Sequence, residues 1–238
     1  MNATSPSSHD RVGPDVEPGR ATARLYQARF SEQEQVRKLE LWRILCKRFF
    51  QRYIAEKDAV LDLGAGYCEF INSIHCRTKY AVDLNPDTAN YASNDVRVIN
   101  ARSSQLRMLA DNSVDVVFAS NFFEHLPDKT EFVATLREVR RILRAGSGRL
   151  LILQPNIRLL NGAYWDFLDH HLPLTERTLV EALDLVGLTP VEVRTRFLPY
   201  TTKSRLPQHS LLVGAYLRFR PLQWLLGRQT WMVAVKRE

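Results

Sequence analysis

The sequence contains few cysteines and no long apolar segment. Its 238 residues include three cysteines, which are too few for a disulfide scaffold and point to a reducing compartment. No apolar run approaches the roughly 20 residues that a membrane-spanning helix requires. The N-terminus also lacks the charged and then apolar pattern of a secretion signal. These absences argue against an exported or membrane-spanning protein, and they predict a cytoplasmic one.

The composition is that of a globular protein, with an uneven distribution of charge. Apolar residues make up 45% of the chain and charged residues 25%, so we expect a folded domain with a sizeable core. The formal net charge is +7, and residues 191–238 hold nine basic residues against Glu192 and Glu238. This basic end suits an acidic partner such as a nucleic acid, an anionic membrane or a phosphorylated substrate. A solvated basic surface explains it equally well.

The chain divides into three parts by composition and pattern. Residues 1–22 are rich in serine, proline, glycine and charge, which predicts a disordered leader. Residues 23–56 are expected to form a helical extension, because a capping box at Ser31 precedes apolar residues at helical spacing. Residues 57–238 form the main domain, with residues 197–228 as an insert or lid between its last two strands.

From residue 58 onward, strand patterns alternate with helix patterns. Such alternation predicts an α/β fold in which helices cover both faces of a mostly parallel sheet. The end of the chain differs, because two strands there are separated only by the insert. We therefore expect a doubly wound, Rossmann-like sheet of seven strands whose last strand is antiparallel. The predicted strands are residues 59–63, 80–83, 96–99, 114–119, 150–153, 190–196 and 230–235, and helices are expected from Asp128 and Thr175.

A glycine turn with two nearby carboxylates indicates a nucleoside ligand. Gly64-Ala65-Gly66 follows the first strand, where a parallel sheet presents backbone N–H groups and a helix N-terminus to a ligand. Asp62 precedes the turn, and Asp83 ends the second strand. In doubly wound sheets, an acid at the position of Asp83 binds ribose hydroxyls.

The same turn argues against phosphate-bearing ligands. The dinucleotide fingerprint requires glycine or alanine at the position of Glu69, whose carboxylate would repel a pyrophosphate. No G-K-[ST] sequence of a phosphate-binding loop follows. S-adenosylmethionine carries a ribose, a sulfonium and an ammonium group but no phosphate, and Asp62 and Glu69 suit its positive charge.

An ordered set of motifs resembles the class I S-adenosylmethionine-dependent methyltransferases, type-11 branch. The resemblance covers about residues 55–196. It begins with the glycine turn and its strand, which are similar to the first motif of the family. The tripeptide Glu124-His125-Leu126 is similar to one found in the type-11 branch. The segments that carry the resemblance, in order, are residues 60–66, 82–84, 111–119, 124–126 and 136–152.

The resemblance implies S-adenosylmethionine as cofactor and a set of residues that bind it. Two departures from the family pattern concern this set. Cys68 stands where the family often has a third glycine, and Asn100, Ala101 and Arg102 stand where it often has an acid for the adenine, so the serines that follow are the candidates for that contact. The predicted cofactor-binding residues are Asp62, Gly64, Ala65, Gly66, Asp83, Leu84, Ser103, Ser104, Asn121 and Phe122.

Two histidines are the candidate catalytic residues. His125 follows the fourth strand, and His170 lies in an aromatic and acidic loop, residues 164–171, beyond the fifth. Either could act as a general base on a hydroxyl acceptor, and Asp169 could orient His170 or its neighbour His171. The alternative for His125 is a structural role, in which it packs against the next helix. The alternative for His170 is a position in a surface loop without a catalytic role. We predict no metal site, because the sequence has no spaced cysteine or histidine set.

The composition of the insert, residues 197–228, indicates what kind of acceptor is methylated. Its apolar residues alternate with arginines, which suits an anionic membrane surface, a lipid-linked phosphorylated acceptor, or a lid. We expect methyl transfer, at oxygen, to a small molecule or a glycan or glycolipid, with residues 205–228 as a candidate contact to the inner face of a membrane. Nucleic acid is not the expected partner, because no RNA-binding module or base-methylation motif is present. An RNA methyltransferase and a non-catalytic methyltransferase-like scaffold stay as alternatives.

Overall fold

The computed structural model describes residues 32–200 and 210–238. The predicted leader, residues 1–22, and the capping box at Ser31 lie outside these ranges. Part of the insert, residues 201–209, lies outside them as well.

A seven-stranded sheet forms the centre of the protein. Its strands are ordered β3-β2-β1-β4-β5-β7-β6. Strands β1 to β5 run parallel, whereas β7 is antiparallel to both of its neighbours, β5 and β6. The predicted fold class is thereby confirmed, including the antiparallel last strand. The strands are β1 (Ala59–Leu63), β2 (Thr78–Asp83), β3 (Val96–Asn100), β4 (Val116–Ser120), β5 (Arg149–Pro155), β6 (Leu188–Arg194) and β7 (Gln229–Lys236).

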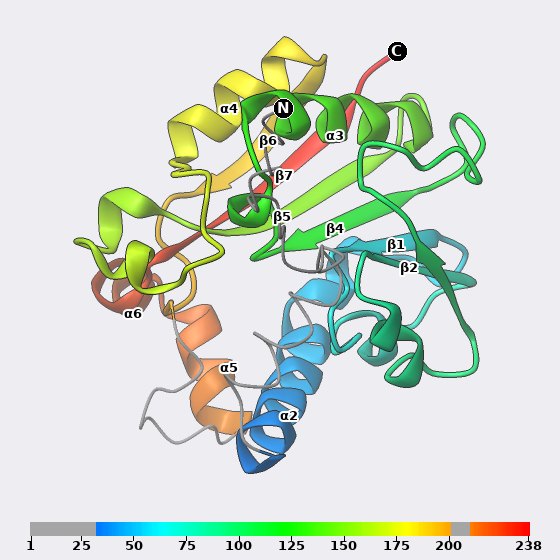
Figure 1. Cartoon of the computed structure of the whole chain (residues 1–238). Helices are drawn as coiled ribbons and strands as arrows, with labels where there is room; N and C mark the ends of the chain where they lie inside the picture. Colours follow the sequence, from blue (N-terminus) through cyan, green and yellow to red (C-terminus); the bar gives the residue numbers. More distant parts are fainter. Residues whose placement is uncertain (1–31, 201–209) are drawn as a thin grey trace, which may run out of the picture.

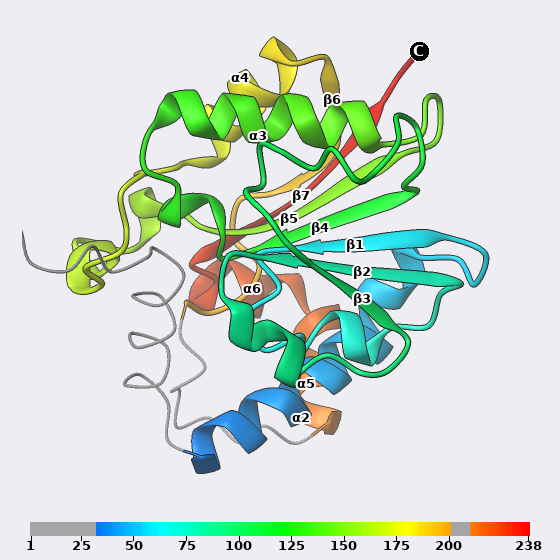
Figure 2. The same ribbon diagram turned by 45° about the vertical axis from the view of Figure 1, so that its right-hand side comes forward.

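Helices cover both faces of this sheet, as Figures 1 and 2 show. Helices α3 (Lys129–Ile142) and α4 (Glu176–Leu185) lie on one face, and α2 (Glu32–Arg48) and α5 (Ser210–Arg218) lie side by side on the other. A short helix, α6 (Arg220–Leu226), follows α5. Successive strand residues point to opposite faces, so Leu61 joins the core under α3 and α4, while Val60 joins the core against α2.

The helix starts follow the predicted capping signals. The side chain of Asp128 accepts a hydrogen bond from the backbone N–H of Glu131, and Thr175 caps α4 in the same way through Thr178. The apolar side chain of Val180 in α4 is 38% exposed. Each residue advances about 100° around a helix, so Val180 is turned away from the face on which its neighbour Leu179 is buried.

The N-terminal helix is packed on the sheet. Trp42 of α2 meets Phe118 of β4 edge to face, with ring centroids 6.0 Å apart, and stacks on Phe50. Phe50 begins η1 (Phe50–Tyr53), a short 3-10 helix that leads into the main domain. Helix α2 therefore forms one wall of the second core, although the domain boundary at residue 57 stays a prediction.

Candidate active site

The glycine turn at the end of β1 has the backbone geometry that only glycine adopts easily. Gly64 has φ +73° and Gly66 has φ +52°, in the left-handed region that side chains disfavour. The N–H groups of Gly64 and Ala65 both donate to the carbonyl of Val82 in β2. A Cβ atom on Gly64 would lie 2.3 Å from Cδ2 of Phe122. The turn is thus fixed between the end of β2 and the ring of Phe122.

Asp83 ties the glycine turn to the end of β2. Its Oδ2 accepts a hydrogen bond from the N–H of Gly66, and its Oδ1 accepts one from the N–H of Asn85, both at 2.8 Å. Burial raises the pKa of Asp83 despite these hydrogen bonds. The adjacent Leu84 is 44% exposed. The structure thus brings Gly66, from the first predicted motif, together with Asp83 and Leu84, from the second.

Asp62 is buried behind the same turn. Burial and then the charge of Glu69 raise the pKa of Asp62 well above its usual value, although the backbone of Ile71 hydrogen-bonds to it. A cationic group near this carboxylate would stabilise its ionised form. Glu69 itself forms an ion pair with Lys38 of α2, with Nζ and Oε1 2.8 Å apart. Its carboxylate therefore has a partner within the protein, in addition to any attraction for a positively charged ligand.

After the glycine turn the chain enters η2 (Ile71–Ser73), a 3-10 helix of three residues. Cys68 precedes it with φ +59°, and its buried side chain lies 3.8 Å from the carbonyl of Thr88. A left-handed residue cannot continue a right-handed helix, so the turn leads into a short element. Such an element is a poor phosphate site, which agrees with a ligand that carries no phosphate.

The left-handed conformation of Cys68 leads to a stability prediction. Glycine adopts this backbone freely, whereas alanine keeps a cost of about 1 kcal/mol. We expect Cys68→Gly to be more stable than Cys68→Ala by about that amount, measured by urea unfolding. The buried Cys46 in α2 serves as the control, where alanine should exceed glycine by about 1 kcal/mol. The same order at both positions would contradict the prediction.

Ser103 and Ser104 are turned toward α3. The hydroxyl of Ser103 lies 2.7 Å from that of Thr135, and the hydroxyl of Ser104 donates to Glu131 at 2.6 Å. Both partners belong to α3. The hydroxyl groups of these two serines, which were predicted to contact the adenine, thus bond to α3 and not to the glycine turn.

Asn121 and Phe122 leave the end of β4 in a sharp turn. Asn121 has φ +48°, and its N–H donates to the carbonyl of Leu153 in β5. This turn sets the ring of Phe122 against Gly64, so closely that the glycine has no room for a side chain. The chain then enters η4 (Phe123–His125), a 3-10 helix at the carboxyl ends of the strands.

His125 and Asp169 form a pair across two loops. Nδ1 of His125 lies 3.2 Å from Oδ2 of Asp169 and 3.0 Å from its backbone carbonyl oxygen. Burial lowers the pKa of His125, but the hydrogen bond to Asp169 and the charge of Glu124 outweigh it, so the pKa is raised. Asp169, which was expected to orient a histidine of its own loop, thus holds His125 of η4.

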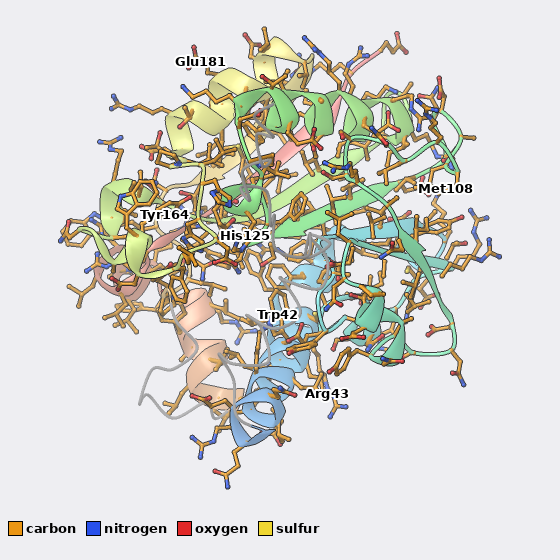
Figure 3. The ribbon with its side chains drawn as sticks, viewed as in Figure 1. Trp42, Arg43, Met108, His125, Tyr164 and Glu181 are labelled. Carbon is orange, nitrogen blue, oxygen red and sulfur yellow. The ribbon has the colours of Figure 1, made fainter. Side chains whose placement is uncertain are left out.

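His170 lies beside His125 in a buried position. It is 8% exposed, and the two imidazole rings are 5.0 Å apart. Nδ1 of His170 is 2.8 Å from the carbonyl oxygen of Tyr164. Figure 3 labels Tyr164 and His125, which come from the loop after β5 and the end of β4. The surface-loop alternative for His170 is therefore wrong, and the two candidate catalytic residues come together.

Glu124 joins this pair, although it was not among the site residues expected from the sequence. It is 1% exposed, and its Oε2 accepts a hydrogen bond from Nε2 of Gln154 in β5 at 2.9 Å. Its backbone carbonyl accepts the N–H groups of His171 and Leu172, which fixes the His170 loop to η4. The only sequence signal for this residue is its place in the Glu124-His125-Leu126 tripeptide.

The strand order with an antiparallel β7, the glycine turn and the acid at the end of β2 together define the class I methyltransferase fold. A family model described as a methyltransferase domain, type 11, matches residues 61–152. Residues 61–152 therefore belong to a methyltransferase domain, and this family implies S-adenosylmethionine as the cofactor. Comparison with curated proteins gives no match.

Solved structures share the fold at low sequence identity. An S-adenosylmethionine-dependent methyltransferase of Archaeoglobus fulgidus superposes with a TM-score of 0.61 at 21% identity, covering 82% of this chain and 93% of that one. A methyltransferase of Thermotoga maritima gives 0.60 at 17%, covering 90% and 98%. A Haloferax volcanii protein solved in complex with the Trm112 methyltransferase activator gives 0.63 at 17%, covering 91% and 97%.

Proposed function

We propose that this protein transfers the methyl group of S-adenosylmethionine to an oxygen atom of a polar acceptor, which is a small molecule or the glycan part of a glycolipid. The cofactor lies along the ends of β1 and β2. Asp83 binds its ribose hydroxyls, the backbone of Gly64 to Gly66 lies against it, and Leu84 covers the adenine. Asp62 provides negative charge near its ammonium group.

The observation that supports oxygen as the target is the group of Glu124, His125 and His170, of which Glu124 and His170 are buried. His125 is close enough to Asp83, at the end of β2, for its charge to act on that carboxylate. Transfer to a hydroxyl requires that the acceptor lose its proton. The acceptor oxygen forms a bond to the methyl carbon as the carbon–sulfur bond breaks, and the electron pair of that bond stays on sulfur. The two histidines promote loss of the hydroxyl proton, either by accepting it or through a cation that they hold.

The exposed face of the insert supports an amphipathic acceptor. Helices α5 and α6 expose apolar side chains next to basic ones, a combination that favours anionic lipid surfaces. None of the described helices is long and apolar enough to cross a membrane. The exposed large apolar residues are Leu211, Leu212, Phe219, Trp224, Leu225 and Leu226, and Arg218 and Arg220 lie among them.

The direct test is incorporation of label from methyl-labelled S-adenosylmethionine. Purified protein is incubated with cell extract, which is then separated into glycan, lipid, protein and nucleic-acid fractions. We expect label in the glycan or lipid fraction, and much less label with an Asp83→Ala control when the cofactor is kept below the concentration that saturates the wild type. Label in the nucleic-acid fraction would favour the RNA methyltransferase instead. Absence of both transfer and cofactor binding would favour the non-catalytic scaffold.

A further inference from the structure

The side chains of Glu124, His125 and His170 lie close enough together to share one bound ion. One oxygen or nitrogen from each lies within 4.8 Å of the other two. A first-row cation at about 2.1 Å from each ligand holds pairs of ligand atoms up to about 4.2 Å apart. Side-chain adjustments of about half an ångström would therefore close the three groups around one ion.

Each of the three side chains also has a hydrogen-bond partner outside the group. Nδ1 of His125 is held by Asp169, and Nδ1 of His170 by the carbonyl of Tyr164. Because a carbonyl oxygen accepts only, Nδ1 of each ring is the protonated nitrogen and Nε2 carries the lone pair in the neutral ring. Metal-binding histidines are oriented in this way, by a carboxylate or a carbonyl on the other nitrogen.

The balance of charge in this group favours a cation. Glu124 is 1% exposed, and no lysine or arginine in the described part of the chain forms an ion pair with it. The carboxylate of Asp169 lies on the far side of His125. A cation bound beside this buried carboxylate would offset its negative charge.

Gln154 adds an independent observation. Its amide nitrogen donates to Glu124, yet its Oε1 is buried without a hydrogen-bond partner in the structure. An unpaired buried acceptor is costly. A water molecule on a metal ion held by Glu124 would supply a donor close to this amide.

We propose that Glu124, His125 and His170 bind a divalent cation of the first transition row, such as Zn²⁺, Co²⁺ or Ni²⁺. Imidazole ligands favour these ions over Mg²⁺ and Ca²⁺, which prefer oxygen ligands alone. Three protein ligands leave coordination positions open, as in catalytic rather than structural sites. No metal-binding pattern is visible in the sequence, because His170 lies far along the chain from the other two residues.

The role of the cation rests on the proposed function. An acceptor hydroxyl bound at an open coordination position of the cation would become more acidic and would lose its proton to water. Its oxygen would then attack the methyl carbon as the carbon–sulfur bond breaks. Two open positions suit an acceptor with two adjacent oxygen atoms, such as the vicinal diol of a sugar. The cation therefore narrows the acceptor class to molecules that can chelate it.

Metal binding is tested without any acceptor. Tag-free, full-length protein is dialysed against a chelator and titrated with Co²⁺, followed by visible absorption, and with Zn²⁺ in a calorimeter. We expect one equivalent to bind. Glu124→Gln and His170→Gln should weaken binding by more than about tenfold, as should Asp169→Asn through the orientation of His125. The control variants His75→Ala and His171→Ala remove exposed histidines and should bind as the wild type does.

The outcomes separate this inference from the proposed function. Equal Co²⁺ affinity in wild type, Glu124→Gln and Asp169→Asn would overturn the site, as would the absence of binding in the wild type. Asp169 is partly exposed, so its variant tests the site even if the buried Glu124 variant fails to fold. We expect the metal-free wild type and the three variants to bind S-adenosylmethionine with the same affinity. If the metal-free wild type does not bind S-adenosylmethionine, the proposed function is contradicted. If it binds S-adenosylmethionine but no metal ion, only the proposed cation site is contradicted.

Discussion

Replacing Asp83 with alanine is expected to weaken binding of S-adenosylmethionine by about 10- to 100-fold. A hydrogen bond to a charged group contributes about 1.5–3 kcal/mol when it is lost, and 1.4 kcal/mol corresponds to a factor of ten in affinity. The alanine variant would lose the proposed hydrogen bonds between the carboxylate of Asp83 and the ribose hydroxyls. The substitution would also release the N–H groups of Gly66 and Asn85, which the carboxylate holds in the structure.

Titration calorimetry with S-adenosylmethionine measures this effect. A conservative variant at the same position and a control variant at another position are measured alongside it. Asp83→Asn keeps the size and one oxygen acceptor, so its loss should be smaller than that of Asp83→Ala. Asp184→Ala, at an exposed position of α4, should bind as the wild type does. If Asp83→Ala retains full affinity, the ribose site does not lie at the end of β2.

Replacing Gly64 with alanine is expected to destabilise the protein by about 2–5 kcal/mol. The left-handed backbone at φ +73° accounts for about 1–2 kcal/mol. The clash of the new Cβ with Phe122, at 2.3 Å from Cδ2, adds about 1–3 kcal/mol through displacement of the ring. Because the same ring borders the cofactor turn, cofactor affinity should fall in any protein that stays folded.

A double variant separates the two contributions. In Gly64→Ala with Phe122→Ala, the clash is removed and the backbone cost stays, so the two substitutions should be less destabilising together than their sum. Urea unfolding of the four proteins gives this coupling energy. Gly214→Ala is the matched control, because that glycine lies in α5 with nothing within 4 Å of its Cβ. It should be neutral or stabilising by up to about 1 kcal/mol. Additive effects at Gly64 and Phe122 would show that the ring moves without cost.

The sequence predicted the parts of the protein that depend on local pattern. The five parallel strands follow from apolar runs bounded by turns, and the glycine turn follows from the small residues after β1. Asp83 could be found because it ends the next strand along the chain, and parallel strands end at one edge of the sheet. The starts of α3 and α4 were predicted by Asp128 and Thr175, whose capping chemistry is local.

Side-chain partners distant in sequence could not be predicted. Ser103 bonds to Thr135 because the loop after β3 passes along α3, and no local pattern encodes that path. Glu69 has its ion-pair partner in Lys38, from a helix that precedes the whole sheet. His170 meets Glu124 only because an irregular loop after β5 folds back over η4. Periodicity does not determine the course of such a loop.

The position of β7 has a consequence for biosynthesis. In the described pairings, β6 bonds only to β7, and β7 lies between β6 and β5. While the chain is being synthesised, β1 to β5 can assemble as a parallel sheet, but the edge of β5 stays open and β6 has no partner until residues 229–236 have left the ribosome. An open strand edge recruits other chains. Nascent chains stalled before β7 are therefore the species most exposed to aggregation, and the cell's chaperones would have to protect the β5 edge over the whole synthesis of the insert.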